Sequence, residues 1–136
     1  MAEAKRPLPS FPEPDTEPFW EATKQHELRY QVCDACDGIV FFPRAHCPHC
    51  LSMSLSWKTS RGEGTIYTFT VVRQIGHPAF REKIPYAVAW IDLDEGFRML
   101  SNVVSDAPDQ LEIGQRVRVT WEDQEDGISL PLFTPA

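Results

Sequence analysis

The sequence predicts a mainly β protein with a short N-terminal helix, a zinc ribbon and a five-stranded barrel of the OB type. Three observations predict it. All four cysteines form two Cys-x-x-Cys pairs, a stretch free of helix breakers precedes them, and segments of alternating hydrophobicity follow them. We expect an extended, proline-rich arm over 1–14, the helix over 15–30, the ribbon over 31–57 and an OB-fold domain over 58–136.

The composition is that of a globular protein without the marks of a nucleic-acid or membrane protein. Of the 136 residues, 42% are hydrophobic and 11% aromatic, and the formal charge is −7 with no basic stripe to neutralise phosphates. No apolar run approaches the roughly 18 residues of a membrane span, and the first residues lack the apolar core of a secretory signal. We therefore expect a cytoplasmic protein with no nucleic-acid or membrane partner.

Five of the twelve prolines lie in the first 18 residues, and four of these lie in the arm that precedes the helix. Asp15 or Thr16 is the expected N-cap, and the pattern then continues without breakers to about Arg29. Phe19 and Trp20 begin an uneven apolar stripe. The two aromatic residues either pack on this chain's own domain or anchor a partner, because aromatic residues are enriched in interface cores.

The ribbon rests on Cys33, Cys36, Cys47 and Cys50. In a reducing compartment, paired Cys-x-x-Cys motifs bind metal more often than they form disulfides. Each pair makes a tight turn that presents two thiolates, and two such turns complete a tetrahedron with Zn–S distances of about 2.3 Å. Four thiolates close the coordination sphere, so the zinc should be structural and supply folding energy on the order of 10 kcal/mol.

Residues around the cysteines support this pattern and leave the metal open. Gly38 follows the first pair, where positive φ is easily reached, and residues 39–43 are expected to form a strand that returns to the second pair. His46 and His49 are expected to stay outside the coordination sphere. An iron centre of the rubredoxin type uses the same four ligands, whereas two disulfides would need an exported protein.

The remaining chain predicts five short strands joined by turns, as in a small Greek-key barrel, with the five-stranded OB fold as the best candidate. The last strand contains Pro131 and is therefore expected at an edge. The five are "GTIYTFTVV" (64–72), "YAVAWIDL" (86–93), "FRMLSNVV" (97–104), "QRVRVTWE" (115–122) and "ISLPLF" (128–133).

The connection over residues 73–86 is long for a hairpin, and long loops are often functional. We expect it to expose His77, Pro78 and Phe80, and it ends at Tyr86. These four residues, with the two aromatic residues of the helix, are the candidate contacts to a partner or a substrate channel. His77 is either an ordinary loop histidine or a group presented to the active site of a partner.

The order of motifs resembles one family along nearly all of residues 15–133. The motifs are "FW" in the helix, "C..C", "PR..CP.C", "GTIYTFTVV", "PYAVAWIDLDEGFRMLSNVV" and "IGQRVRV". The chain is similar to the thiolase-associated zinc-ribbon and OB-fold proteins catalogued as domain of unknown function 35. The resemblance implies a rubredoxin-like ribbon and a C-terminal OB fold, and all four cysteines match the ligand positions of the family.

The resemblance also implies a function in a complex. Members typically act with a thiolase-like or lipid-transfer-protein-like catalytic subunit, in ketothiolases or retro-aldol lyases, and support that subunit while it carries the catalytic residues. A heterotetramer built on the dimer of the partner is the implied assembly. Its substrate is a CoA thioester, which this chain is not expected to bind tightly.

The residues independently favour a non-catalytic role. A thiolase needs a reactive cysteine and a histidine base, and four metal-bound thiolates leave no cysteine to be acylated. We therefore expect no catalytic residue and no activity of this chain alone. The alternatives are a single-stranded nucleic-acid-binding module, disfavoured by eight Lys/Arg against twelve Asp/Glu over 58–136, and a stand-alone enzyme or electron carrier.

Overall fold

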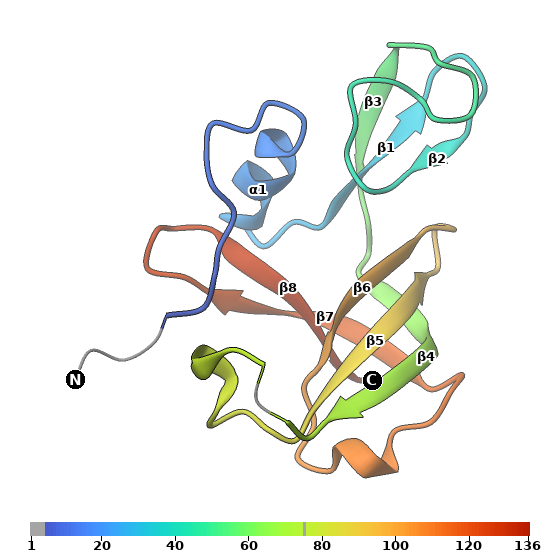
Figure 1. Cartoon of the computed structure of the whole chain (residues 1–136). Helices are drawn as coiled ribbons and strands as arrows, with labels where there is room; N and C mark the ends of the chain where they lie inside the picture. Colours follow the sequence, from blue (N-terminus) through green and yellow to red (C-terminus); the bar gives the residue numbers. More distant parts are fainter. Residues whose placement is uncertain (1–4, 75) are drawn as a thin grey trace.

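The structure, a computed structural model, describes residues 5–74 and 76–136 and consists of a helix, a three-stranded ribbon and a closed barrel (Figure 1). Within these residues no helix is both long and apolar enough to cross a membrane. The elements are α1 (Glu17–Thr23), β1 (Arg29–Cys33), β2 (Ile39–Val40), β3 (Leu55–Thr59), β4 (Glu63–Val72), the 3-10 helix η1 (Pro78–Phe80), β5 (Tyr86–Leu93), β6 (Arg98–Val103), the 3-10 helix η2 (Pro108–Gln110), β7 (Arg116–Asp123) and β8 (Ser129–Pro135).

The helix α1 is shorter than expected. It begins after Thr16, as predicted, but ends at Thr23 instead of continuing to about Arg29. The chain turns at His26, where φ is 59°, and Arg29 already belongs to β1. Leu28, just before β1, lies in the main hydrophobic core. Tertiary packing of the extended chain has therefore overridden the helical propensity of this stretch.

The end of α1 is attached to the barrel by two sets of contacts. The backbone N–H of Ser129 donates to Oγ1 of the buried Thr23 at 3.1 Å. The ring of His26 stacks on Trp121 at 5.3 Å, and its Nε2 lies 2.7 Å from Oδ1 of Asp123. The helix is thereby fixed against the β7–β8 hairpin (Figure 1).

The ribbon sheet has the order β2-β1-β3, and β1 pairs antiparallel with β3 from Arg29↔Thr59 to Cys33↔Leu55. The returning strand β2 stops at Val40, short of the expected end at residue 43. Beyond it the chain is held differently, because the buried side chain of Gln31 makes two hydrogen bonds to the backbone of Arg44, at 2.9 and 3.0 Å. The expected boundary between residues 57 and 58 falls inside β3.

The five barrel strands follow the order β4-β5-β6-β8-β7 and close on themselves, which confirms the predicted OB-type barrel. The expected edge position of the last strand is wrong, since β8 lies between β7 and β6. It pairs with β7 over seven residues but with β6 in one parallel pair, Val103↔Phe133. We call this sparsely bonded junction the β6–β8 seam.

Pro131 is tolerated because of this seam. The β7–β8 hydrogen bonds extend outward to Gln124–Ile128 and Arg116–Ala136, and this alternation turns the nitrogen of Pro131 away from β7. The nitrogen of Pro131 faces the seam instead. The β6–β8 ladder has a single registered pair there, so the missing N–H of proline costs no ladder hydrogen bond.

One hydrophobic core joins the barrel, β1 and α1. Ile91, Val117 and Phe133 form its fully buried centre, and Leu28 and Phe19 extend it into the helical region. Stacked aromatic rings continue it into the ribbon. Phe97 of the β5–β6 turn lies 4.9 Å from Tyr30 and 4.7 Å from Phe41 between ring centroids.

Candidate functional site

The two Cys-x-x-Cys turns of the ribbon have the same local conformation. The N–H of Asp37 donates to the carbonyl of Cys33, and the N–H of Leu51 donates to that of Cys47, both at 2.9 Å. Asp37 and Leu51 occupy equivalent positions and both have positive φ, 60° and 66°. The two turns are thus a matched pair that can present four sulfurs to one point.

Gly38 has a different role from the expected one. The positive φ falls on Asp37, so Gly38 is required for space: a Cβ there would lie 2.7 Å from Cδ2 of His49 and 3.2 Å from Sγ of Cys36. His49 therefore packs over the first turn, with Nε2 3.4 Å from the carbonyl oxygen of Ile39. It supports the site from outside.

The four sulfurs have the spacing of a tetrahedral metal site. Sγ of Cys33 and Cys50 are 3.5 Å apart, those of Cys36 and Cys47 are 3.7 Å apart, and all four lie within 4.8 Å of one another. A zinc ion with Zn–S bonds of 2.3 Å requires sulfurs about 3.8 Å apart. The cysteines are free thiols, and their arrangement supports a structural zinc with no coordination position left for a substrate.

The electrostatics of the cluster also call for a cation. Hydrogen bonding by the backbone N–H of Cys36 is the main cause that lowers the pKa of Cys33 to about 7, so this thiolate forms readily. The backbone N–H of Gly38 also favours the thiolate of Cys36, yet burial and the neighbouring thiols outweigh it and raise the pKa of Cys36 to about 12. A bound metal ion would favour the thiolate form of such a cluster, because its positive charge offsets the repulsion between neighbouring thiolates.

The two candidate contacts in the helix differ in burial. Phe19 is 6% exposed and belongs to the main core, with its ring edge-on to Phe41 at 5.9 Å. Trp20 is half-buried, edge-on to Phe19 at 5.0 Å. Packing within this chain explains Phe19, while contact of either residue with a partner stays a prediction.

The loop between β4 and β5 gathers three of the other candidates into a row of rings. His77 caps η1 by accepting from the N–H of Ala79 through Nδ1 at 3.1 Å. Its ring lies 6.2 Å from Phe80, which lies 5.5 Å from Tyr86. Pro78 is exposed as expected, but His77 and Phe80 are half-buried. Their contact with a partner stays a prediction, and any such contact of His77 would use Nε2.

Sequence reasoning missed Arg6, which ties the arm to this loop. Its guanidinium lies 4.9 Å from the Phe80 ring, and Nη1 donates to Oε1 of Glu122 at 3.1 Å. Nζ of Lys83 lies 3.6 Å from the same oxygen. No local pattern could indicate this contact, because Arg6 and Glu122 are 116 residues apart.

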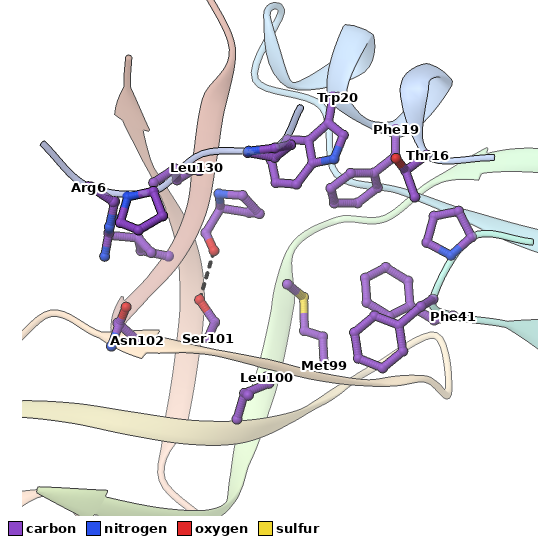
Figure 2. Close-up of a pocket in the computed structure, with 16 residues that line it drawn as sticks. Arg6, Thr16, Phe19, Trp20, Phe41, Met99, Leu100, Ser101, Asn102 and Leu130 are labelled. Carbon is purple, nitrogen blue, oxygen red and sulfur yellow. Dashed lines mark hydrogen bonds between the residues drawn. The ribbon is translucent and has the colours of Figure 1, made fainter. Parts of the chain in front are cut away.

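A pocket of about 460 Å³ opens beside the β6–β8 seam (Figure 2). The arm, α1, the chain after β2, and strands β6 and β8 all contribute to its walls. Phe19 and Trp20 point into it from the helix, and Met99 lies below them (Figure 2). Arg6 lines both this pocket and a second one of about 300 Å³ beside the β4–β5 loop.

Two family descriptions match the chain, and they follow the architecture. "ChsH2, rubredoxin-like zinc ribbon domain" matches residues 20–56, and "ChsH2, C-terminal OB-fold domain" matches residues 57–122. Among solved structures, a chain of "Ltp2-ChsH2(DUF35) aldolase" is 37% identical with a TM-score of 0.84, over 94% of this chain and 98% of that one. A DUF35 protein of unknown function from Sulfolobus solfataricus, 15% identical with a TM-score of 0.64, shares the fold.

Curated relatives are of two kinds. A "DUF35 domain-containing scaffold protein" of Methanothermobacter thermautotrophicus is 34% identical over 77% of this chain and 82% of its own length. A "Probable enoyl-CoA hydratase alpha subunit" of Thermomonospora curvata is 39% identical over 98% of this chain, and a "3-oxo-4,17-pregnadiene-20-carboxyl-CoA hydratase alpha subunit" of Mycobacterium tuberculosis is 33% identical over 82%. The chain spans only 41% and 35% of those two subunits. These matches confirm the resemblance: the chain belongs to the DUF35 family of rubredoxin-like zinc-ribbon and OB-fold proteins.

Proposed function

We propose that this chain is a non-catalytic accessory subunit of a thiolase-superfamily enzyme that acts on acyl-CoA thioesters. The observation that carries the proposal is the likeness, over nearly the full length of both chains, to a chain of the Ltp2-ChsH2(DUF35) aldolase. A retro-aldol lyase or ketothiolase is the corresponding reaction class. The partner would be a lipid-transfer-protein-like or thiolase-like subunit, and the assembly a heterotetramer built on the partner's dimer.

The chemistry of the described residues favours a non-catalytic role for this chain. All four cysteines converge on one metal centre, so none is left as a nucleophile, and Nδ1 of His77 is engaged in capping η1. A closed four-thiolate site also has no position at which to activate water or a carbonyl. The carbon–carbon bond chemistry therefore falls to the partner, while this chain supports its fold and acyl-CoA channel.

A hydratase-type partner is the second candidate, because two relatives are named hydratase alpha subunits. This chain aligns with less than half of each, so most of those subunits has no counterpart in these 136 residues. The aldolase-like assembly is favoured because its chain is covered at 98%.

Co-expression tests the proposal. The chain is produced with a thiolase-fold subunit and, separately, with a hydratase-fold subunit encoded near it, and each pair is tested for co-purification and acyl-CoA turnover. We expect a stable complex and carbon–carbon bond cleavage or formation only with the thiolase-fold subunit. Full activity of the large subunit alone, or turnover by this chain alone, would contradict the accessory role. A complex formed only with the hydratase-fold subunit would instead identify a hydratase-type partner.

The helix provides a sharper test of the interface. Trp20→Ala should weaken the complex by roughly 2 kcal/mol or more if this half-buried indole is a hot spot. Phe19 is unsuitable for the same test, because its truncation would damage the core of the free chain. Ile113→Ala, at an exposed position, is the matched control. Calorimetric titration with the partner measures the affinity of both variants. Equal affinities for Trp20→Ala and wild type would show that Trp20 is not a hot spot of the interface.

A further inference from the structure

Residues 5–12 of the arm are attached to the rest of the chain by few polar contacts. Within the described part of the chain, none of them takes part in a backbone hydrogen bond, and three of them are prolines, which lack the donor. Lys5 lies 3.7 Å from Glu125, but both side chains are almost fully exposed, so this ion pair contributes little. Arg6 is therefore the main polar anchor of the arm.

The Arg6 side chain is 17% exposed and is held by groups from two different elements. Its Nη1 donates to Oε1 of Glu122 in β7 at 3.1 Å. Its guanidinium lies over the ring of Phe80 in the β4–β5 loop, 4.9 Å from the ring centroid, where a cation is attracted to the face of the ring. The arm, the loop and the barrel thus meet at one side chain.

Lys83 reaches the same two groups from within the loop. Its Nζ lies 3.6 Å from the same oxygen of Glu122 and 5.9 Å from the centroid of the Phe80 ring. Two cations therefore share one carboxylate oxygen, and Glu122 keeps a partner when Arg6 leaves. No unpaired buried charge results, because the Glu122 side chain is 37% exposed and the freed guanidinium is hydrated. This arrangement favours reversible release of Arg6 within the folded chain.

The loop that Arg6 contacts is folded on itself around Phe80. Three of its N–H groups donate to carbonyls inside the loop at 3.0–3.2 Å, and the N–H of Ala79 donates to Nδ1 of His77. The rings of His77 and Tyr86 lie 6.2 and 5.5 Å from the ring of Phe80. A displacement of Phe80 therefore affects both the cap of η1 and the start of β5.

Arg6 is also a wall shared by two cavities. It lines the pocket beside the β6–β8 seam, where Figure 2 shows it next to Asn102, and the smaller pocket beside the loop. The other residues common to both linings, Asn102 and Leu132, belong to barrel strands β6 and β8. Of the three, Arg6 alone lies outside the barrel strands, so it can move while the barrel stays closed.

We propose that the arm is a strap latched by Arg6, and that the arm and the β4–β5 loop open together as one conformational unit. In the closed state Arg6 lies on Glu122 and Phe80. In the open state the strap is released, the loop loses one of its two cations, and the wall between the two cavities is removed. Coupling of this kind is reciprocal, so a change that loosens the loop also loosens the arm. The latch belongs to this chain alone and is independent of any catalytic partner.

The test uses the full chain loaded with zinc, without ligand or partner. Hydrogen exchange of the amides bonded within the loop measures loop opening, and nitrogen-15 relaxation of the Leu8 and Ser10 amides measures order in the arm. Arg6→Ala should speed exchange of the loop amides at least about fivefold and lower the heteronuclear NOE of the two arm amides. Lys5→Ala removes the neighbouring, exposed cation and should leave loop exchange within about twofold of wild type.

A reciprocal variant distinguishes one coupled unit from two separate contacts. Phe80→Leu keeps an apolar side chain in the loop but removes the ring on which Arg6 lies, so it should lower the heteronuclear NOE of the arm amides. In the double variant of Arg6→Ala and Phe80→Leu the arm should be no more mobile than in either single variant, because both changes remove the same latch. Circular dichroism and zinc content establish that each variant is folded.

Three results would overturn the latch. Arg6→Ala could loosen the arm while loop exchange stays within twofold of wild type, which would make the contact a local tether. Lys5→Ala could have the same effect as Arg6→Ala, which would assign the effect to charge in general. Phe80→Leu could leave the arm as ordered as in wild type, which would show that the loop does not hold it.

Discussion

The ribbon and the barrel are stabilised in different ways although they belong to one chain. The barrel surrounds a core of fully buried side chains, including Ile91 and Phe133, and closes five strands into one sheet. The buried core of the ribbon itself is Cys33, Val40 and Cys47, two of which are proposed metal ligands. A module with so little apolar surface to bury needs another source of folding energy, and coordination supplies it.

The two ends of the ribbon also differ in what stabilises them, apolar packing at one end and the metal site at the other. Its proximal end is packed on the barrel through Tyr30 and Phe41, which stack on Phe97. Its distal end has the two cysteine turns and the hydrogen bonds of Asp34, which accepts from Ser54 and Ser56 at 3.0 and 2.7 Å. Loss of the metal should therefore destabilise mainly the distal end of the ribbon.

The largest expected effect is at the metal. Cys47→Ser removes a charged ligand and should cost the ribbon a large part of a metal-binding free energy on the order of 10 kcal/mol. Elemental analysis should find about one zinc per wild-type chain and substantially less in the variant. Hydrogen exchange should show loss of protection in the distal ribbon and retention in the barrel. A metal-free wild-type protein with full protection in the ribbon would refute the four-thiolate centre.

The next effect is in the barrel core. Phe133→Ala leaves a cavity at a fully buried site and should lower the free energy of unfolding by about 3–5 kcal/mol. Urea denaturation followed by circular dichroism measures it, with Ile113→Ala at an exposed position as control. Because one core joins the barrel, β1 and α1, all three should unfold together. Separate transitions for α1 and the barrel would contradict that single core.

A smaller effect is expected where the ribbon meets the pocket. Gln31→Leu leaves the N–H and carbonyl of Arg44 without their partner and should cost about 1–3 kcal/mol. Faster hydrogen exchange at residues 41–44, with zinc content unchanged, is the expected signature. Gln110→Leu, at an exposed position, is the control, and equal exchange in the two variants would show that Gln31 does not hold this segment.

The smallest effect concerns acid stability of the barrel. Two hydrogen bonds from Arg116, at 2.8 and 2.7 Å, lower the pKa of Asp94 below its ordinary value. A carboxyl group with a depressed folded-state pKa contributes stability above its unfolded pKa of about 3.9 and loses it as pH falls through the folded pKa. Asp94→Asn should therefore lower the Tm slightly at pH 6, and this difference from wild type should be smaller at pH 3. A constant Tm difference at both pH values would exclude this linkage.

Local patterns in the sequence predicted the parts of the molecule that local chemistry determines. Cysteine spacing predicted the ribbon, and the hydrophobic pattern located the five barrel strands to within two residues at every end. The geometry of the first cysteine turn was not predicted correctly, since positive φ falls on Asp37 and not on Gly38. The helix end was misplaced because Leu28 is drawn into a core formed by distant strands.

The pocket could not be predicted, for a related reason. Its walls come from segments that the fold alone brings together, and the contact of Arg6 with Glu122 spans 116 positions. Pro131 led to the prediction of an edge strand, which is wrong. Its position between two strands follows from the sparse bonding of the seam, which belongs to the barrel as a whole.

The strand β3 has a consequence for how such chains are inherited. The two family descriptions meet between residues 56 and 57, inside Leu55–Thr59, the strand that pairs with β1 along its whole length. A recombination joint at this position would divide one strand between two genes and separate Tyr30 from the ring of Phe97. Helix, ribbon and barrel should therefore be inherited together, and a longer Thermomonospora curvata subunit aligns with 134 residues of this chain, across this joint.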